Sequence, residues 1–324
     1  MLNDRAISFR YMDTSCKAPW TEKSVQCQYE NDDDPSVTEK GVSEEDIQLI
    51  LDEHNRYRSA VKPKARQMQK MYWSDELEAT AQKWAQTCNK KHDSFANRKV
   101  PDWRVVIGQN GAFGHSSWAE AIAGWHGEVK LFTYGKKYTS RSTPKWTAIG
   151  HYTQVVRDIS VLVGCGYAKC GSTKFCFCNY SYTNNGRTIG RPYVRVPTNS
   201  SSCIGCPDNC SDNLCDCNGL LCKNGKIDLK TCSCKCRDNY WTGDDCGTRV
   251  CAGLTCKNGG KLNVDSCTCT CSSSLWTGRE CDQQDPSQCK DPGYCTVPQP
   301  YGYLGLCQYS NVKQECPKMC NICQ

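Results

Sequence analysis

Apolar residues recur at helical spacing in three stretches of the N-terminal half. The first stretch follows Ser43, a residue type that caps helices, and its spaced positions are Ile47, Ile50, Leu51, His54 and Tyr57. The second follows Ser74, and its inner positions are Leu77, Ala81, Trp84, Ala85 and Cys88. The third covers residues 118–132, with one side formed by Ile122, Trp125, Val129 and Phe132. The pattern predicts three helices, each with one buried face.

After residue 160 the helical spacing gives way to short runs rich in β-branched and aromatic residues. The runs at residues 161–165, 174–180 and 192–196 predict strands. Three helices with a small antiparallel sheet favour a layered α+β fold. Residues 1–42 contain the acidic run Asp32-Asp33-Asp34 before Pro35, and we expect an N-terminal extension there, with a solvated linker and no chemistry.

The cysteine content indicates the compartment in which the chain folds. The chain has 29 cysteines in 324 residues, with 7 in residues 1–200 and 22 in residues 201–324. Such a density predicts disulfides and secretion, and the uneven distribution separates a domain with a core from small disulfide-dependent modules. Residues 1–13 are too polar for a signal peptide, so we expect a mature form or an incomplete sequence. No apolar run is long enough to cross a membrane.

The net charge of +6 conceals an uneven distribution of charge. Residues 1–46 hold eleven acidic and five basic residues, a net of −6, so the remainder carries +12. Basic residues gather at Arg58, Lys62, Lys64, Arg66 and Lys70, and again at Lys90, Lys91, Arg98 and Lys99. Such a surface suits sulfated glycans, anionic lipid headgroups or acidic receptors, and ordinary solvation is the alternative. A nucleic-acid partner is not expected of an oxidised, secreted chain.

Two motifs carry a family resemblance. Residues 150–156 read Gly-His-Tyr-Thr-Gln-Val-Val, and residues 177–180 read Phe-Cys-Asn-Tyr. Together with a His-Asn pair in the first predicted helix, they resemble the CAP superfamily of cysteine-rich secretory, antigen 5 and pathogenesis-related 1 proteins. The resemblance implies an α-β-α sandwich over residues 43–197. Arg157 departs from the family pattern, which usually has Trp there. His54 lies on the apolar stripe, and a core role is favoured over a site role.

The resemblance also implies a shallow cleft with two His and two Glu, in which the His pair can hold a divalent metal. The matching positions are His92, Gln109, Glu128 and His151. Gln109 replaces a Glu and cannot ionise or act as a general base. Either the residues form a structural polar network, or His92 and His151 hold a weak Zn²⁺ ion. No cofactor is required, and hydrolysis is not favoured because no nucleophile with a base is visible.

The cysteines after residue 198 suggest four small modules. Residues 198–216 resemble the hinge of cysteine-rich secretory proteins, which implies the bridges Cys203–Cys210 and Cys206–Cys215. A repeat with a period of 34 to 35 residues follows, over residues 217–246 and 251–281, and resembles two EGF-like modules without a calcium signature. That resemblance implies the bridges Cys217–Cys232, Cys222–Cys234, Cys236–Cys246, Cys251–Cys267, Cys256–Cys269 and Cys271–Cys281.

The last module, residues 289–323, resembles a ShK toxin-like domain. The resemblance implies the bridges Cys289–Cys323, Cys295–Cys316 and Cys307–Cys320. Channel-blocking members carry an adjacent Lys-Tyr pair, and no such pair stands between the third and fourth cysteines. An adhesive or regulatory module is therefore favoured over a channel blocker. We expect the two EGF-like modules to be inserted between the hinge and the last module. This insertion would move the last module away from the core domain, which favours reach over a fixed surface formed jointly by the two.

Seven cysteines remain. Cys16 and Cys27 can pair with each other, and the family implies Cys88–Cys170 and Cys165–Cys178. Cys176 is left over, as a buried free thiol or as a bond to another chain. Sequons stand at Asn179, Asn199 and Asn209, and Asn199 in the Ser-rich linker is the expected glycan site.

These observations favour a secreted, non-enzymatic protein that works by binding an extracellular protein or a sulfated glycan. A sterol or lipid carrier is the first alternative. A metal-dependent hydrolase and an ion-channel-modulating toxin are less favoured alternatives.

Overall fold

A computed structural model describes most of the chain from Asp33 onward. The described residues are 33–100, 103–183, 189–251, 253–264, 266–291, 295, 307–309, 312–313, 316–320 and 322. The predicted Cys16–Cys27 pair lies outside them, and so does Cys323 of the predicted Cys289–Cys323 pair. The chain divides into two compact units, one running to Lys235 and including Asp244–Gly247, the other formed by Cys236–Gly243 and the residues from Thr248 onward.

Among the described residues, the first unit contains four α-helices. They are α3 (Glu44–Ser59), α4 (Asp75–Ala85), α5 (Trp118–Gly127) and α6 (Gly150–Val155). Serine side chains cap the first three: the Oγ atoms of Ser43, Ser74 and Ser117 each accept from the backbone N–H of the third residue of the helix. The third predicted helix is shorter than expected, because α5 ends at Gly127 and the 3₁₀ helix η2 (Glu128–Leu131) follows. Cys88 lies beyond the end of α4, with φ of 53°.

The sheet contains five strands. They are β1 (Val37–Lys40), β2 (Tyr72–Trp73), β3 (Gly108–Phe113), β4 (Leu162–Cys170) and β5 (Thr173–Tyr180). The order is β1-β4-β5-β3, and the pairs along it are antiparallel, whereas β2 runs parallel to β4. Two expectations were wrong. Residues 192–196 form no strand and contribute only the bridge of Arg195 to Ala65, and the expected extension contains β1, which is held by β4.

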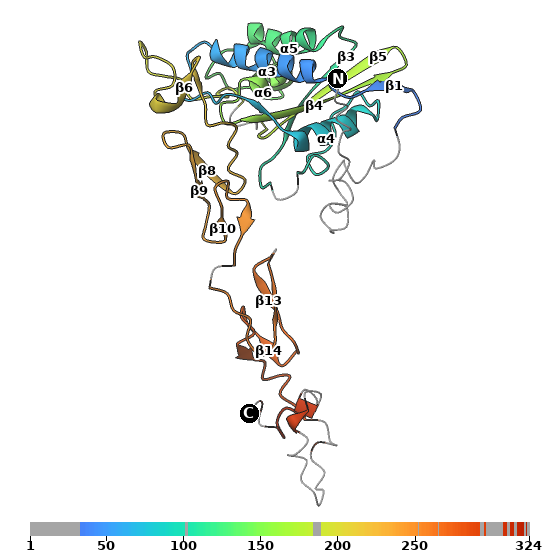
Figure 1. Ribbon diagram of the computed structural model, residues 1–324, viewed down its shortest axis with the longest axis vertical. Helices are drawn as coiled ribbons and strands as arrows, with labels where there is room; N and C mark the ends of the chain where they lie inside the picture. Colours follow the sequence, from blue (N-terminus) through green and yellow to red (C-terminus); the bar gives the residue numbers. More distant parts are fainter. Residues whose placement is uncertain are drawn as a thin grey trace, which may run out of the picture. The chain divides into compact units, whose positions relative to one another are not determined.

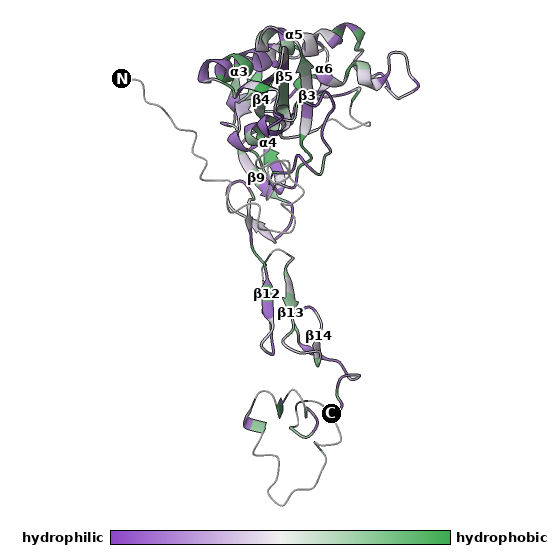
Figure 2. Cartoon of the chain, turned by 90° about the vertical axis from the view of Figure 1, so that its right-hand side faces the viewer, coloured by the Kyte–Doolittle hydropathy of each residue, from purple (hydrophilic) through white to green (hydrophobic). Residues whose placement is uncertain are grey.

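The sheet lies between two helical layers. Helices α3, α5 and α6 lie on one face and α4 on the other, as Figure 1 shows. Apolar residues of β4 and β5 fill the interior (Figure 2), where Val163 and Phe177 have no exposed surface. The backbone of α4 approaches β4 closely, because a Cβ at Gly164 would lie 2.1 Å from the backbone N of Glu78. This is the α-β-α sandwich that the sequence predicts.

Two arginines that were expected at the basic surface are buried. Arg58 has no exposed surface, and its guanidinium donates to the carbonyl oxygens of Gln69, Val155, Arg157, Asp158 and Ser160 at 2.6–3.5 Å. Carbonyls at the end of α6 have no helical partner, and the fork of five donors satisfies this group of acceptors. Arg98 is 4% exposed and lies beside Asp93.

The residues after 198 form short hairpins held by disulfides. The hairpins are β6–β7 (Cys210–Ser211, Leu214–Cys215), β8–β9 (Gly225–Asp228, Ser233–Cys236), β10–β11 (Trp241–Thr242, Thr248–Arg249), β12–β13 (Lys261–Asn263, Thr268–Thr270) and β14–β15 (Trp276–Thr277, Gln283–Gln284). The bridges are Cys203–Cys210, Cys206–Cys215, Cys217–Cys232, Cys222–Cys234, Cys251–Cys267, Cys256–Cys269, Cys271–Cys281, Cys295–Cys316 and Cys307–Cys320. Cys236, Cys246 and Cys289 are also disulfide-bonded.

The Lys-Asn pair that recurs in the two repeats has the same role in each. Asn224 Nδ2 donates to the carbonyl of Cys246 at 2.9 Å, and Asn258 Nδ2 donates to that of Cys281 at 2.7 Å. The preceding lysines form ion pairs, Lys223 with Asp245 and Lys257 with Glu280. The pair therefore ties the first loop of each repeat to its last cysteine.

The sandwich has two further bridges, Cys88–Cys170 and Cys165–Cys178. Cys176 is a buried free thiol on β5, opposite Tyr167 of β4 and Ala112 of β3. Burial raises the pKa of this thiol to about 12. In the part of the chain that the structure describes, no helix is both long and apolar enough to cross a membrane.

Candidate functional site

A cleft of about 500 Å³ opens at the edge of the sheet where β3 faces α5 and α6. Its lining is Lys90, Lys91, His92, Gly111, Ala112, Phe113, His115, Ala121, Gly124, Trp125, His151 and Phe177. Sequence reasoning placed His92 and His151 in one cleft, and both line this one. The other two predicted residues, Gln109 and Glu128, contact the imidazoles without lining the cleft.

His92 is the outer end of a hydrogen-bonded chain that reaches into the sandwich. Its Nδ1 lies 2.8 Å from Gln109 Oε1, and Gln109 Nε2 donates to Asn179 Oδ1 at 3.0 Å. Asn179 Nδ2 in turn donates to Thr80 Oγ1 at 2.9 Å. An amide oxygen accepts, so His92 donates through Nδ1, which leaves its Nε2 without a proton in the neutral ring. Loss of surrounding water lowers the pKa of His92, and the Gln109 hydrogen bond opposes that shift.

His151 is oriented by Glu128. Its Nδ1 lies 2.8 Å from Glu128 Oε1, and the second carboxylate oxygen accepts from the backbone N–H of Tyr152 at 3.0 Å. The signature motif forms α6, so His151 lies in the first turn of a helix, while Glu128 begins η2 directly after α5. Trp125 stacks on His151 with ring centroids 6.4 Å apart. The carboxylate thus fixes both the ring and the start of α6.

The two imidazoles lie close to each other, with ring centroids 6.4 Å apart and planes inclined by 44°. Each uses Nδ1 on a neighbour, so Nε2 is the nitrogen available for a ligand. Two imidazoles without a third protein donor form a weak site, because catalytic zinc usually has three protein ligands. Among the described residues, no group of three His, Cys, Asp or Glu donors gathers at this cleft.

His54, the other histidine weighed for a site role, belongs to the core. Its Nδ1 donates to the carbonyl of Ile50 at 2.7 Å, and its Nε2 accepts from the Tyr180 hydroxyl at 2.9 Å. That hydroxyl accepts in turn from Asn110 Nδ2 at 3.3 Å. Burial lowers the pKa of His54 to about 4, so the ring is neutral at physiological pH.

Sequence reasoning missed the buried pair behind His92. Asp93 Oδ1 lies 2.5 Å from Arg98 Nε, and both side chains are almost fully buried. Burial raises the pKa of Asp93 to about 6, against the opposing charge of Arg98. Arg98 also donates to the carbonyl oxygens of Asp93 and Ile107. The adjacency of Asp93 to His92 was the available signal, but Arg98 was counted as a surface cation.

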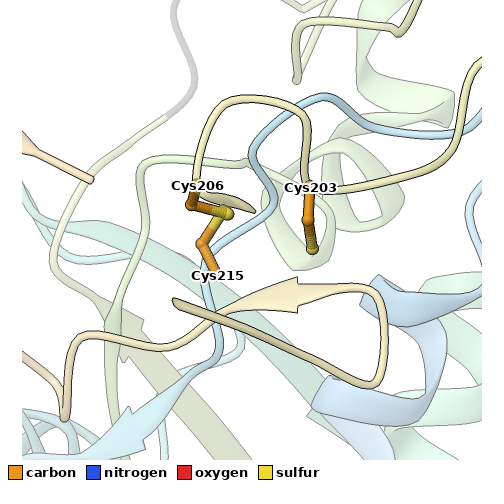
Figure 3. Close-up of side chains that lie close together, drawn as sticks. All are labelled: Cys203, Cys206 and Cys215. Carbon is orange, nitrogen blue, oxygen red and sulfur yellow. A yellow bond between two sulfur atoms is a disulfide. The ribbon is translucent and has the colours of Figure 1, made fainter. Parts of the chain in front are cut away.

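A cluster of cysteine sulfurs in the hinge resembles a metal site by distance alone. One sulfur each of Cys203, Cys206 and Cys215 lie within 4.8 Å of one another (Figure 3). All three are oxidised, in the bridges Cys203–Cys210 and Cys206–Cys215. A metal needs thiolates, so this cluster has no ligands to offer in the oxidised protein.

The three sequons differ in access. Asn179 has no exposed surface, and its amide belongs to the chain behind His92. Asn209 Nδ2 donates to the carbonyl oxygens of Leu229 and Lys230. Asn199 is exposed, with φ of 67°. Glycosylation of Asn199 stays a prediction.

Comparison with known proteins identifies the family. The cysteine-rich secretory protein family (CAP) matches residues 51–180. Cysteine-rich venom protein Mr30 of Conus marmoreus is 30% identical over 280 residues, which are 85% of this chain and 79% of that protein. Cysteine-rich secretory protein 3 of Homo sapiens is 36% identical over 233 residues, which are 65% of this chain and 91% of that protein. The chain belongs to the cysteine-rich secretory protein family.

Family membership confirms the resemblance that the two motifs carry. Residues 51–180 contain all four predicted cleft positions of this CAP protein. Among solved structures, venom allergen-like protein 4 of Schistosoma mansoni is 25% identical with a TM-score of 0.40, and the match covers 48% of this chain and 97% of that one.

Proposed function

We propose that this CAP protein is secreted and acts by binding an extracellular protein, without catalysis. The observation that carries the proposal is the composition of the cleft. Among the described residues that line it, no Ser, Thr or Cys side chain could serve as a nucleophile. Gln109 stands where a second carboxylate would be needed for general acid–base work, and Glu128 is engaged by His151 and Tyr152.

The cysteine modules support a binding role outside the cell. The alternating pairs Cys217–Cys232 with Cys222–Cys234, and Cys251–Cys267 with Cys256–Cys269, suit EGF-like modules. The pairs Cys295–Cys316 and Cys307–Cys320 suit a ShK-like end. Such modules bury little apolar surface and depend on disulfides, so they suit display of a binding surface in an oxidising medium.

The test is chemical cross-linking of the full chain to intact cells and extracellular matrix. We expect a saturable partner, displaced by excess unlabelled protein, and equal capture by Glu128→Gln and by the control Glu120→Gln on the exposed face of α5. Hydrolysis of ester or peptide substrates that is lost in Glu128→Gln but kept in Glu120→Gln would contradict the proposal. A stoichiometric sterol extracted from the purified protein would favour the carrier instead.

We also propose that His92 and His151 can hold one weakly bound Zn²⁺ ion through their Nε2 atoms. The Nδ1 hydrogen bonds support this, because they set the tautomer that leaves Nε2 bare. Zinc titration by calorimetry should show a zinc affinity reduced about tenfold or more in His151→Ala, because loss of even a residue that supports a metal ligand usually costs that much. His126→Ala, outside the cleft lining, is the control. Identical curves for wild type and His151→Ala would contradict the metal site.

A further inference from the structure

Strand β3 is an edge of the sheet. Among the described strands, it pairs with β5 alone. In an antiparallel pair, successive residues point their backbone groups alternately to the partner and away from it. The N–H of Gly114 donates to the carbonyl of Lys174 on the β5 side at 2.9 Å. Ala112 and Asn110 therefore face β5 as well, and Gly111 and Phe113 point outward.

An independent contact confirms this direction. The carbonyl of Gly111 accepts from Trp125 Nε1 at 3.0 Å, and Trp125 lies outside the sheet, on α5. Within the described residues, the N–H of Gly111 and both backbone groups of Phe113 have no hydrogen-bond partner. Such unpaired groups on an edge strand are a template for another strand unless they are covered.

The cleft runs along this free edge. Gly111, Ala112 and Phe113 are consecutive lining residues, with Trp125 on one side and Phe177 on the other. Side chains that would fill the space are missing, because Ala121 and Gly124 face β3 across the cleft. A volume of about 500 Å³ suits a short peptide stretch.

The rim of the cleft is cationic. Lys90 and Lys91 are exposed and line it. Within the described residues neither lysine forms an ion pair: the nearby Glu128 is paired with His151, and Glu120 lies beside Ser116 and His115. Acidic side chains on an occupant would therefore find unneutralised lysines.

We propose that an extended, acidic segment of a protein partner binds here as an added strand on β3. Its backbone pairs with the outward N–H of Gly111 and with both backbone groups of Phe113, and its acidic side chains reach Lys90 and Lys91. This mode takes its affinity from main-chain hydrogen bonds and its selectivity from alternate side chains. The inference rests on the proposed binding function and names the partner chemistry for its cleft.

The test uses a phage-displayed library of random linear peptides, selected on the immobilised full-length protein. The best binder is then synthesised with single backbone N-methyl groups at each position. An added strand presents every second N–H to β3, so N-methylation should abolish binding at alternate positions and be tolerated at those between. We expect acidic sequences, and binding about tenfold or more weaker in Lys90→Glu/Lys91→Glu, since two charge contacts are reversed.

Two matched controls separate the edge from general surface effects. Lys62→Glu/Lys64→Glu makes the same charge change at exposed lysines outside the cleft and should bind as wild type does. Gly124→Leu fills the cleft and should abolish binding, whereas Gly127→Leu, where an added Cβ meets no neighbour within 4 Å, should not.

Uniform tolerance of N-methylation, or equal effects of the two lysine pairs, would overturn the strand-addition proposal. So would selection of no peptide, together with a heparin fragment that binds through Lys90 and Lys91. A cross-linked partner that survives Gly124→Leu would leave the general binding function in place and reject only this site.

Discussion

Gln109 is held in place as an amide by its neighbours. It accepts from His92 and donates to Asn179, and the side-chain amide of Asn179 donates to Thr80. A glutamate could still accept from His92, but its second oxygen would face the Asn179 oxygen with no proton between them. Gln109, which stands in place of a glutamate, therefore belongs to the packing of α4 against the sheet.

Replacing Gln109 with Glu tests this account. We expect Gln109→Glu to raise the pKa of His92, because a nearby negative charge favours the imidazolium. It should also cost about 1–3 kcal/mol of unfolding free energy, the usual penalty for a buried polar group without its partner. NMR titration of the His92 ring and urea unfolding measure the two effects. Gln283→Glu, at an exposed position of β15, is the control, and an unchanged stability of Gln109→Glu would contradict the amide requirement.

Two buried groups give opposite pH dependence to stability. The pKa of His54 falls to about 4, so the unfolded chain takes up this proton first and stability is lost as pH falls from about 6.5. The pKa of Asp93 rises to about 6, so the folded protein takes up that proton first and stability is gained as pH falls toward 3.8. Between pH 4 and pH 6 the two contributions offset each other.

Removing one of the two groups should reveal the contribution of the other to the pH dependence of stability. In Asp93→Asn the opposing gain is lost, so stability should decline more steeply than in wild type from pH 6 to pH 4, by roughly 1 kcal/mol per pH unit. Urea unfolding at a series of pH values measures the slope. The slope of unfolding free energy against pH is compared, and not its absolute value, because the neutral asparagine left beside Arg98 lowers stability at every pH. Parallel curves for the two proteins would contradict the assigned pKa of Asp93.

At the scale of elements, two glycines set the distance between α4 and β4. A Cβ at Gly164 would lie 2.1 Å from Glu78 N, and one at Gly166 would lie 2.2 Å from Gln82 N. Both neighbours are helix backbone, which cannot rotate away as a side chain can. Close approach of α4 therefore requires glycine at both positions of the strand.

Alanine at either position should force the helix off the sheet. We expect Gly164→Ala and Gly166→Ala each to cost about 3 kcal/mol or more, the upper range for overpacking of a core. Thermal unfolding followed by circular dichroism measures the loss. Gly127→Ala is the control, because an added Cβ there meets nothing within 4 Å. A similar melting temperature for all three variants would contradict the close-packing account.

The sequence predicted those elements whose apolar spacing is regular. The caps at Ser43 and Ser74 and the apolar stripes located α3 and α4, and the runs before and after Cys170 located β4 and β5. Strand β3 was missed because Gly108-Gln109-Asn110-Gly111 has no apolar alternation; its place comes from pairing with β5. The four cleft positions came from family motifs, whereas Lys90, Lys91 and His115 reach the cleft only through loop geometry.

At the scale of the whole chain, the hinge and the start of the first repeat pack on the sandwich within one compact unit. Asp216 is the centre of this contact: it accepts from the Tyr72 hydroxyl at 2.5 Å and from Lys70 Nζ at 3.0 Å. Gly219 lies against Tyr72, where a Cβ would approach the ring to 3.1 Å. The hinge is therefore docked at this point.

Loss of the Asp216 carboxylate should loosen the docking. We expect Asp216→Ala to speed hydrogen–deuterium exchange in residues 210–222 and to leave α3 and α5 unchanged. Burial acts to raise the pKa of Asp216, but Tyr72 and Lys70 outweigh it and hold it below the usual value. Wild type should accordingly keep the contact until pH falls below about 4. Asp208→Ala is the control, and unaltered exchange in Asp216→Ala would contradict a docked hinge.

The free thiol of Cys176 is a possible wrong disulfide partner for Cys165 while the chain folds. Cys165 is 13 residues from its partner Cys178 and 11 from Cys176, so closing either loop costs nearly the same chain entropy. Only the register of β4 on β5, which sets Tyr167 opposite Cys176, selects the native partner. The native Cys165–Cys178 bond must therefore form after β4 has paired with β5, or a wrong Cys165–Cys176 bond must later be exchanged for it.

Cys176→Ala should raise the yield of oxidative refolding without changing the folded sandwich. An unchanged yield would show that the sheet always forms before the disulfide.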